Sequence, residues 1–223
     1  MDPLAAEIID QVIRERCTVK VFAEEPLTPS GNVVDIDALL TAGIWAPFHR
    51  PAASVHTQDG SLSSMVPWRF YVLEAASCRR LRTWLQQRGD EGKLPRMLAA
   101  ATAMIQVTWL PHPPSAESEP LPAGALFEPT LVNMEHLAAA SAAVQNVLLA
   151  ATARGVPTYW SSGGALREAE AFKLLGIPHR EIALGSVLLF PADYSEIPGI
   201  EHVPGKLRDK RGSIEEFSRR VEL

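Results

Sequence analysis

The feature that most constrains the fold of this chain is a long segment of small and apolar residues, numbers 133–154. Leu137, Ser141, Val144 and Leu148 recur in it at helical spacing, and alanine occupies much of the remaining surface. A helix that is apolar nearly all round is usually buried on several sides. We therefore expect this helix at the centre of a domain or at a subunit interface.

The rest of the chain alternates shorter helical and strand patterns. An amphipathic pattern predicts a first helix over residues 3–15. Further helices are expected over residues 35–46, 77–88, 95–101, 166–175 and 213–220. Strands are expected over residues 70–73, 103–109 and 182–190. Asp35 or Asp37 can cap the helix at 35–46, and Ser77 can cap the helix at 77–88. Gly155 can end the long helix by adopting the left-handed conformation. This order predicts an α/β or α+β fold with a sheet covered by helices.

Composition limits the classes of protein to consider. With 223 residues, 47% of them hydrophobic, residues 1–223 can form one domain with a sizeable core. A net charge of −5 argues against a duplex nucleic-acid partner, and two cysteines are too few for a disulfide framework. Met1-Asp2-Pro3-Leu4 does not resemble a signal peptide, and no run of about 18 apolar residues predicts a membrane span. We therefore expect a cytoplasmic protein with no membrane partner.

Two segments are expected to be long loops. Residues 48–66 are small, polar and proline-bearing, without any periodicity, and residues 112–128 are rich in proline. Loops of this length are uncommon inside a compact domain and are usually functional or disordered. The second loop is a candidate for a mobile flap.

A basic segment follows the first helix. Alternate residues of an extended stretch project to the same side, so Arg16, Thr18 and Lys20 can face one site. Two cations and a hydroxyl group would suit a phosphate, which arginine binds with its planar fork and lysine as a point charge. A solvated basic turn after the helix explains the same residues, and their spacing alone leaves both interpretations open.

Four further segments, taken in order with the first, form a recognisable pattern. They are Ala46-Pro47-Phe48-His49-Arg50, Pro67-Trp68-Arg69-Phe70, Gln145-Asn146 and Trp160-Ser161-Ser162-Gly163-Gly164. The set resembles the nitroreductase family of FMN-dependent oxidoreductases, in particular its small-subunit branch with Ala-Pro-x-His and Trp-x-Ser-Gly motifs. The resemblance covers residues from about 5 to 217, apart from 48–66.

The resemblance implies roles for the first two segments. Arg16, Thr18 and Lys20 match a family motif, Arg-Arg-Ser-x-Arg-x-Phe, that grips the FMN phosphate and ribityl chain. Cys17 takes the place of an arginine at a cofactor-binding position, and we expect its thiol to pack rather than react, since no histidine or second cysteine adjoins it. His49 matches a histidine that reaches the FMN of the partner subunit. A histidine on a surface loop is the alternative.

The later segments imply contacts with the ring and the phosphate. Trp160, Ser161, Ser162 and Gly163 are expected at the edge of the flavin ring, where backbone N–H groups stabilise negative charge on the reduced ring. Arg211 best matches a C-terminal arginine on the FMN phosphate. The alternative for Trp160 is a place in the core instead of at the flavin. The alternative for Arg211 is a solvated charge cluster instead of the phosphate site.

The sequence departs from the family in one region. Residues 48–66 contain an apparent insertion of about a dozen residues, which costs little in loop-closure entropy. A common Asn-x-Gln before Pro-Trp is replaced by Ser64-Met65-Val66, so a usual pair of amide contacts to the flavin is missing.

The resemblance also implies a fold and an activity. We expect an α+β, three-layer α/β/α sandwich with a mostly antiparallel central sheet, forming homodimers with FMN at the interface. Hydride from NADH or NADPH would pass through FMN to a nitroaromatic, quinone or similar small acceptor in a ping-pong mechanism. The alternatives are a flavin enzyme that acts on a dedicated metabolite or uses oxygen, and a flavin-binding protein without turnover. No metal site is expected.

Overall fold

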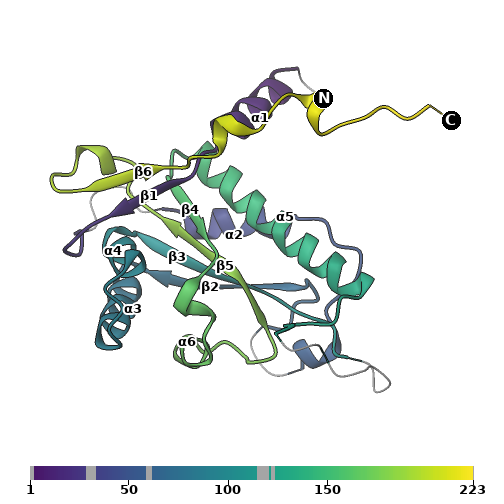
Figure 1. Cartoon of the computed structure of the whole chain (residues 1–223), viewed down its shortest axis with the longest axis horizontal. Coiled ribbons are helices and arrows are strands. Elements are labelled where there is room, and N and C mark those ends of the chain that lie inside the picture. The colour runs from purple at the N-terminus through teal and green to yellow at the C-terminus, as the bar shows by residue number, and fades with distance from the viewer. Residues whose placement is uncertain (1–2, 29–33, 59–61, 115–120, 122–123, 223) are drawn as a thin grey trace.

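A computed structural model of the chain describes residues 3–28, 34–58, 62–114, 121 and 124–222. Its centre is a four-stranded sheet of order β2-β3-β5-β4, in which every neighbouring pair is antiparallel (Figure 1). The strands are β2 (Trp68–Glu74), β3 (Ala103–Trp109), β4 (Thr158–Ser161) and β5 (Ile182–Leu189). All residues of β3 are buried, so this strand is covered on both faces.

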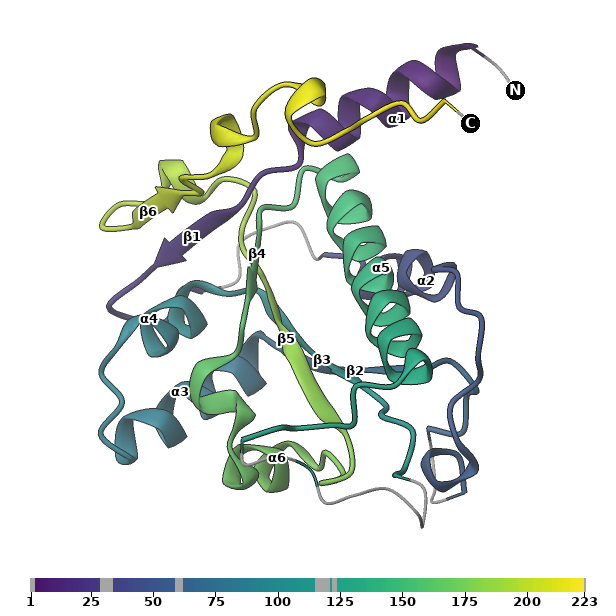
Figure 2. The same cartoon turned by 45° about the vertical axis from the view of Figure 1, so that its right-hand side comes forward.

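Helices cover the two faces of the sheet, as Figure 2 shows. One face carries α2 (Ile36–Ile44) and α5 (Leu131–Ala153), and the other carries α3 (Ala75–Gln87), α4 (Lys93–Ala100) and α6 (Ala169–Leu175). Ile105 and Val107 of β3 share a buried cluster with Val144 of α5. Met104, which alternates with them, shares a cluster with Leu81 of α3. The predicted three-layer α/β/α sandwich with an antiparallel sheet is confirmed.

The long helix lies in the core, as its composition predicted. Thr130 caps α5 by accepting a hydrogen bond from the backbone N–H of Asn133, and Gly155 follows the helix with φ +67° as predicted. Among the described residues, α5 is the one helix with the length and mean hydropathy (1.2) of a membrane span. It contacts α2 and all four central strands. This packing accounts for its apolar surface without a membrane.

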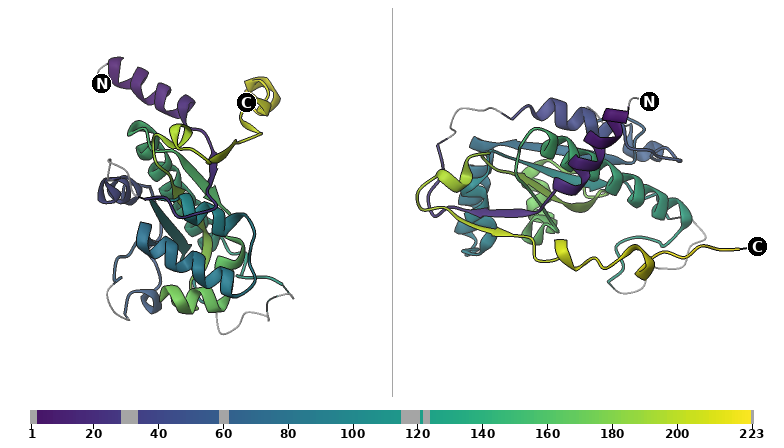
Figure 3. Two further views of the ribbon diagram at one scale, coloured as in Figure 1. Left: turned by 90° about the vertical axis from the view of Figure 1, so that its left-hand side faces the viewer. Right: turned by 90° about the horizontal axis from the view of Figure 1, so that it is seen from above.

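A second, smaller sheet extends the molecule at one end. In it β1 (Val19–Phe22) pairs antiparallel with β6 (Glu201–Pro204), and a single parallel bridge joins Thr18 to Thr158 of the main sheet. Beyond this ribbon, α1 (Pro3–Glu15) and the segment after β6 project past the three layers (Figures 1 and 3). None of the residues of α1 is buried.

Several predicted boundaries need correction. The prediction of a helix over 213–220 is wrong, because the structure has only one 3₁₀ turn there among the described residues, Ile214–Glu216. Ser213 and Glu216 form a capping box there, but every residue from 204 to 222 is exposed, so no core contact extends the turn. The helix predicted over 166–175 is instead a 3₁₀ turn, Gly164–Arg167, followed by α6.

Capping predictions gave a mixed result. Asp35 caps α2, because its side chain accepts a hydrogen bond from the N–H of Ala38 at 3.0 Å. Ser77 is not a cap, since α3 begins at Ala75 directly after β2 and Glu74 occupies the cap position. The remaining 3₁₀ turns are Ser54–His56, Tyr194–Glu196 and Arg208–Lys210.

Candidate functional site

A polar pocket of about 340 Å³ lies where the N-terminal ribbon, α5 and β4 meet. Its lining residues come from both ends of the chain and from its centre: Arg16, Thr18, Gln145, Leu148, Thr158, Trp160 and Arg211. Four of these seven were predicted as site residues, namely Arg16, Thr18, Trp160 and Arg211. The structure therefore brings together side chains that are distant in the sequence.

Hydrogen bonds to backbone carbonyl oxygens join the two ends of the chain at this pocket. Gly205, which follows β6, donates its N–H to the carbonyl oxygen of Thr18 at 2.8 Å. This hydrogen bond places the segment that leads to Arg211 beside the pocket. Arg208 donates to the carbonyl oxygens of Arg14 and Glu15, the second at 3.3 Å. The C-terminal segment is therefore held against the end of α1.

The pocket has the electrostatics of an anion site. Arg16 and Arg211 are its ionisable lining residues, and no carboxylate lines it among the residues that the structure describes. Thr18 adds a hydroxyl group and Gln145 an amide, and both side chains can donate hydrogen bonds. Arginine binds phosphate oxygens with two parallel N–H groups, which makes this donor set suitable for a phosphate monoester.

The position of Trp160 depends on a glycine in the neighbouring strand. Gly185 has φ +154°, and a β-carbon there would lie 2.3 Å from the carbonyl oxygen of Ser161 and 2.7 Å from Nε1 of Trp160. The β3–β5 register shifts at this point, between Val107 and Thr108. Trp160 is 37% exposed and lines the pocket, so it is not a core residue.

The turn after β4 presents small residues beside the pocket. Gly163 has φ +105°, which favours glycine, and its N–H donates to Oγ of Ser161 at 3.2 Å. Arg167 holds the turn by donating to the carbonyl oxygens of Ser162 and Ala183, the latter at 2.7 Å. Ser161, Ser162 and Gly163 adjoin Trp160 along the chain but do not line the pocket themselves.

Three other predicted residues lie outside the pocket. Lys20 follows Thr18 on the same side of the chain, but its Nζ lies 5.0 Å from the centre of the Tyr159 ring. Cys17 is exposed, because it lies outside β1 in the segment that precedes this strand, and this corrects the prediction that its thiol packs. His49 is exposed on the loop after α2.

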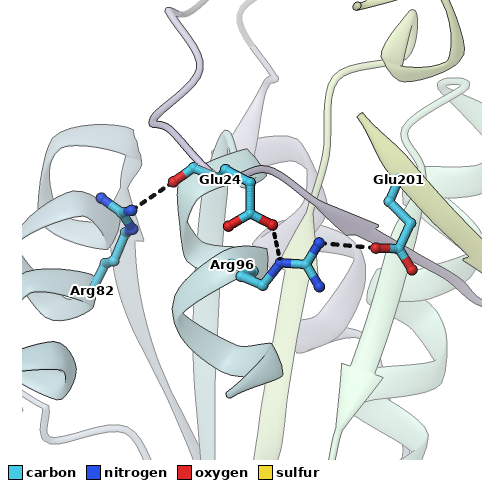
Figure 4. Close-up of polar contacts among 4 residues, drawn as sticks. All are labelled: Glu24, Arg82, Arg96 and Glu201. Atoms are coloured by element: carbon cyan, nitrogen blue, oxygen red, sulfur yellow. Dashed lines mark hydrogen bonds and ion pairs between the residues drawn. The ribbon is translucent and has the colours of Figure 1, made fainter. Parts of the chain in front are cut away.

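An arginine cluster braces the ribbon that carries the pocket (Figure 4). Arg96 of α4 forms ion pairs with Glu24 after β1, at 2.8 Å, and with Glu201 of β6, at 2.9 Å. Its guanidinium also lies 5.1 Å from the centre of the Phe22 ring. Arg82 of α3 donates to the carbonyl oxygen of Glu24 at 2.7 Å. These contacts fasten both strands of the ribbon to the helical layer.

A buried carboxylate lies at the other end of the sheet, away from the pocket. Glu181 accepts hydrogen bonds from Tyr71 at 2.9 Å and from Thr108 at 2.5 Å. Burial raises the pKa of Glu181, and these two hydrogen bonds oppose that shift. The network joins β2, β3 and the start of β5, which indicates a structural role.

Sequence reasoning missed three of the lining residues. Gln145 lies in a segment that supports the resemblance, but it was not predicted as a ligand, and Leu148 was predicted only as an inward-facing helix position. Thr158 belongs to β4, a four-residue strand that no pattern predicted. The Gln-Asn pair in the long helix was the one available signal for these positions.

Comparison with known proteins agrees with the fold. Residues 13–189 match the model of the Nitroreductase family. Three solved structures are similar, and one is a nitroreductase-like family protein from Bacillus cereus, with 22% sequence identity over 96% of each chain and a TM-score of 0.60. A second is a protein from Desulfovibrio desulfuricans in complex with FMN, with 21% identity over 100% of this chain and 99% of that one and a TM-score of 0.55. The third is a nitroreductase with bound FMN from Desulfitobacterium hafniense, with 22% identity over 96% of this chain and 98% of that one and a TM-score of 0.50. The family match covers most of the chain, and it shows that this protein belongs to the nitroreductase family.

Proposed function

We propose that this protein is an FMN-dependent oxidoreductase that passes hydride from NADH or NADPH to a small acceptor such as a nitroaromatic or a quinone. The observation that carries the proposal is the convergence of Arg16, Thr18 and Arg211 on one pocket that no carboxylate lines among the described residues. Bound FMN in two of the similar structures supports the same cofactor here.

The residues present fit the phosphate end of FMN. Two guanidinium groups and a hydroxyl group can neutralise and hydrogen-bond a phosphate monoester. The pocket, about 340 Å³, is near the lower limit of small-molecule sites, roughly 300–1,000 Å³. This pocket would therefore hold the phosphate end of FMN, and the rest of the cofactor would lie outside it.

The chain has two tasks in the proposed reaction. Arg16, Thr18 and Arg211 bind the cofactor, and Gln145 and Trp160 orient it from the side of α5 and β4. Backbone N–H groups of the glycine-containing turn at 161–164 stabilise negative charge on the ring edge. The flavin, when bound, supplies the redox chemistry by accepting hydride and passing electrons on in separate half-reactions. Lys20 and Cys17 remain predicted cofactor contacts, at the edge of this set.

A homodimer is part of the proposal. The 13-residue helix α1 buries none of its residues, and Ile8, Ile9 and Ile13 are each about half exposed. Phe217, in the segment after β6, is 71% exposed. Contiguous exposed apolar groups mark protein interfaces, and a helix this short is marginal in water on its own. A second copy of the chain would cover these groups and bring His49 to the partner's cofactor.

Other partners follow from the same proposal. The protein works on small molecules, with neither nucleic acid nor a membrane as a partner, and the cytoplasm is its proposed compartment. Its net charge of −5 disfavours polyanions in general.

One observation favours a dedicated acceptor as a second candidate. The segment that replaces the family's Asn-x-Gln is engaged elsewhere, because the carbonyl oxygens of Ser64 and Val66 both accept hydrogen bonds from Arg69 at 2.8 Å. Flavin contacts at this point therefore differ from those of the family, and the acceptor site differs with them. A metabolite dehydrogenase or an oxygen-using enzyme would fit such a change.

Purified protein tests the proposal. We expect a yellow protein, or one that takes up added FMN, and oxidation of NADH or NADPH that accelerates when a nitro compound or a quinone is added under nitrogen. Turnover only in air would support the oxygen-using enzyme instead. Bound flavin that no reduced nicotinamide reduces would support a non-catalytic flavin protein, and failure to bind FMN would reject all three.

A further inference from the structure

A single arginine organises the inserted segment. Arg69 of β2 is 4% exposed, and its two terminal nitrogens donate to five backbone carbonyl oxygens. The acceptors and distances are Val66 (2.8 Å), Trp68 (2.8 Å), His56 (3.3 Å), Leu62 (3.0 Å) and Ser64 (2.8 Å). Three of the five lie in the segment 56–64. The guanidinium therefore holds both ends of this stretch to the sheet edge.

Further contacts attach the same segment to its surroundings. Ala52 donates its N–H to the carbonyl oxygen of Met65 at 2.8 Å, which closes the loop. Nε2 of His56 hydrogen-bonds the carbonyl oxygen of Pro111 at 2.8 Å. The described part of the insertion is thus fixed to β2 and to the chain after β3.

This fixed segment and α2 border an open cavity of about 680 Å³, within the usual range for small-molecule sites. Its apolar lining consists of Leu40, Ile44, Leu62, Val66, Trp68 and Phe70. The polar lining residues are Asp37, Thr41, Ser63 and Ser64, with Arg69 beneath the loop. The cavity lies at the β2 edge of the sheet, whereas the pocket of Arg16 and Trp160 lies at the β4 edge.

The charges at this cavity favour a cation. Asp37 and Arg69 are its ionisable lining groups among the described residues. The guanidinium of Arg69 donates to five carbonyl oxygens, which compensate its charge, whereas Asp37 is exposed. The lining also contains the aromatic residues Trp68 and Phe70, and an aromatic ring attracts a cation that lies over its face.

We propose that the cavity between α2 and the segment held by Arg69 binds a flat aromatic molecule that carries a positive charge. The apolar and aromatic wall takes the ring system, and Asp37 pairs with the charge. The site does not depend on the flavin assignment. It disfavours dinucleotide coenzymes, because their phosphates carry the same sign of charge as the Asp37 carboxylate.

Calorimetric titration tests the site on the full-length protein saturated with FMN, so that the cofactor pocket is filled. Thioflavin T, a planar cation, is the probe, and anilinonaphthalene sulfonate is the anionic comparison. We expect saturable binding of one thioflavin T per chain and at least about tenfold weaker binding of the sulfonate. Failure of thioflavin T to bind, or equal affinity for both dyes, would overturn the proposal.

Variants locate the binding. Thr41→Trp places an indole in the cavity from the exposed side of α2 and should weaken thioflavin T binding at least about tenfold. Thr83→Trp, on an exposed position of α3, is the matched control and should leave binding unchanged. Asp37→Asn should weaken binding up to roughly fivefold, the scale of an exposed charge pair, while Glu25→Gln should not. Full affinity in Thr41→Trp would contradict the location, and full affinity in Asp37→Asn would contradict the role of the charge.

Discussion

The backbone N–H of Gly205 donates to the carbonyl oxygen of Thr18 at 2.8 Å, at the wall of the candidate cofactor pocket. A β-carbon at Gly205 would lie 3.1 Å from Cβ of Thr18, so the two segments approach closely. Thr18 also forms the bridge to Thr158 of the main sheet. One residue therefore links the N-terminal ribbon, the C-terminal segment and the central sheet, and the ligands of the proposed phosphate site converge there.

Arg16→Ala should weaken FMN binding much more than it lowers stability. A hydrogen bond to a charged group contributes about 1.5–3 kcal/mol, which corresponds to a loss of affinity of roughly 10- to 150-fold. Titration of apoprotein with FMN gives the affinity, and thermal unfolding without FMN gives the stability. Arg219→Ala, an exposed arginine of the C-terminal segment, is the control. Equal affinities in wild type and Arg16→Ala would reject the phosphate assignment.

Gly185→Ala should displace Trp160. The new β-carbon would lie 2.3 Å from a backbone oxygen, which cannot move as a flexible side chain can. We expect a loss of about 1–3 kcal/mol in the free energy of unfolding and weaker FMN binding. Gly199→Ala is a matched control, because Gly199 also has positive φ (+78°) but a β-carbon added there would have no other atom within 4 Å. If both variants bind FMN like the wild type, Gly185 does not position the pocket.

Arg69→Met should release the loop that precedes β2 while keeping an apolar stem of similar length. Five carbonyl oxygens would lose their donor, and we expect the free energy of unfolding to fall by roughly 2–4 kcal/mol. Hydrogen exchange should show faster exchange at the amide of Ala52 and at residues 54–57, with β3 unchanged. Arg80→Met, on α3, serves as the control. Unchanged exchange in the loop would show that Arg69 does not hold it.

Stability should fall as the pH is lowered from 7 to 5, partly because of His56. Burial lowers the pKa of His56 below its ordinary 6.5, with Arg180 and Arg69 acting in the same direction and the bond to Pro111 opposing. At a pH between the pKa of His56 in the folded protein and 6.5, the unfolded chain binds a proton that the folded protein does not. The free energy of unfolding therefore rises with pH in this range, and the contribution of His56 is fully present above about pH 6.5.

His56→Gln keeps a donor for the carbonyl oxygen of Pro111 but cannot titrate. Urea unfolding of both proteins across this pH range should give a flatter dependence for the variant. Because the pKa of Glu181 is raised, this residue makes the free energy of unfolding fall as the pH rises. The effect is the same in the wild type and in His56→Gln, so it cancels when the two proteins are compared. Parallel curves would show that His56 does not contribute.

The layers of this fold could be predicted because their patterns are long. Residues 133–154 and the buried strands at 103–109 and 182–190 carry enough apolar residues to define both type and approximate limits. The strands β1, β4 and β6 have four residues each, too few for a period-2 pattern to stand out. Their pairing comes from tertiary contacts, which sequence patterns do not contain.

The site could be predicted only through the order of its segments. The spacing of Arg16 and Thr18 alone favoured a solvated turn, and nothing local connects these residues to Arg211. Lys20 shows the limit of alternation: β1 diverges from the main sheet after the Thr18–Thr158 bridge, and the lysine lies over Tyr159 instead of at the pocket. The cavity at the β2 edge lies beside the loop before β2, where the family pattern gives no guidance.

A crystal structure of the protein saturated with FMN is the most direct test of the central claim. We predict phosphate oxygens within hydrogen-bonding distance, about 2.7–3.2 Å, of both Arg16 and Arg211, with the flavin ring near Trp160. FMN bound with its phosphate elsewhere, or a fully formed pocket that stays empty at saturating FMN, would contradict the account.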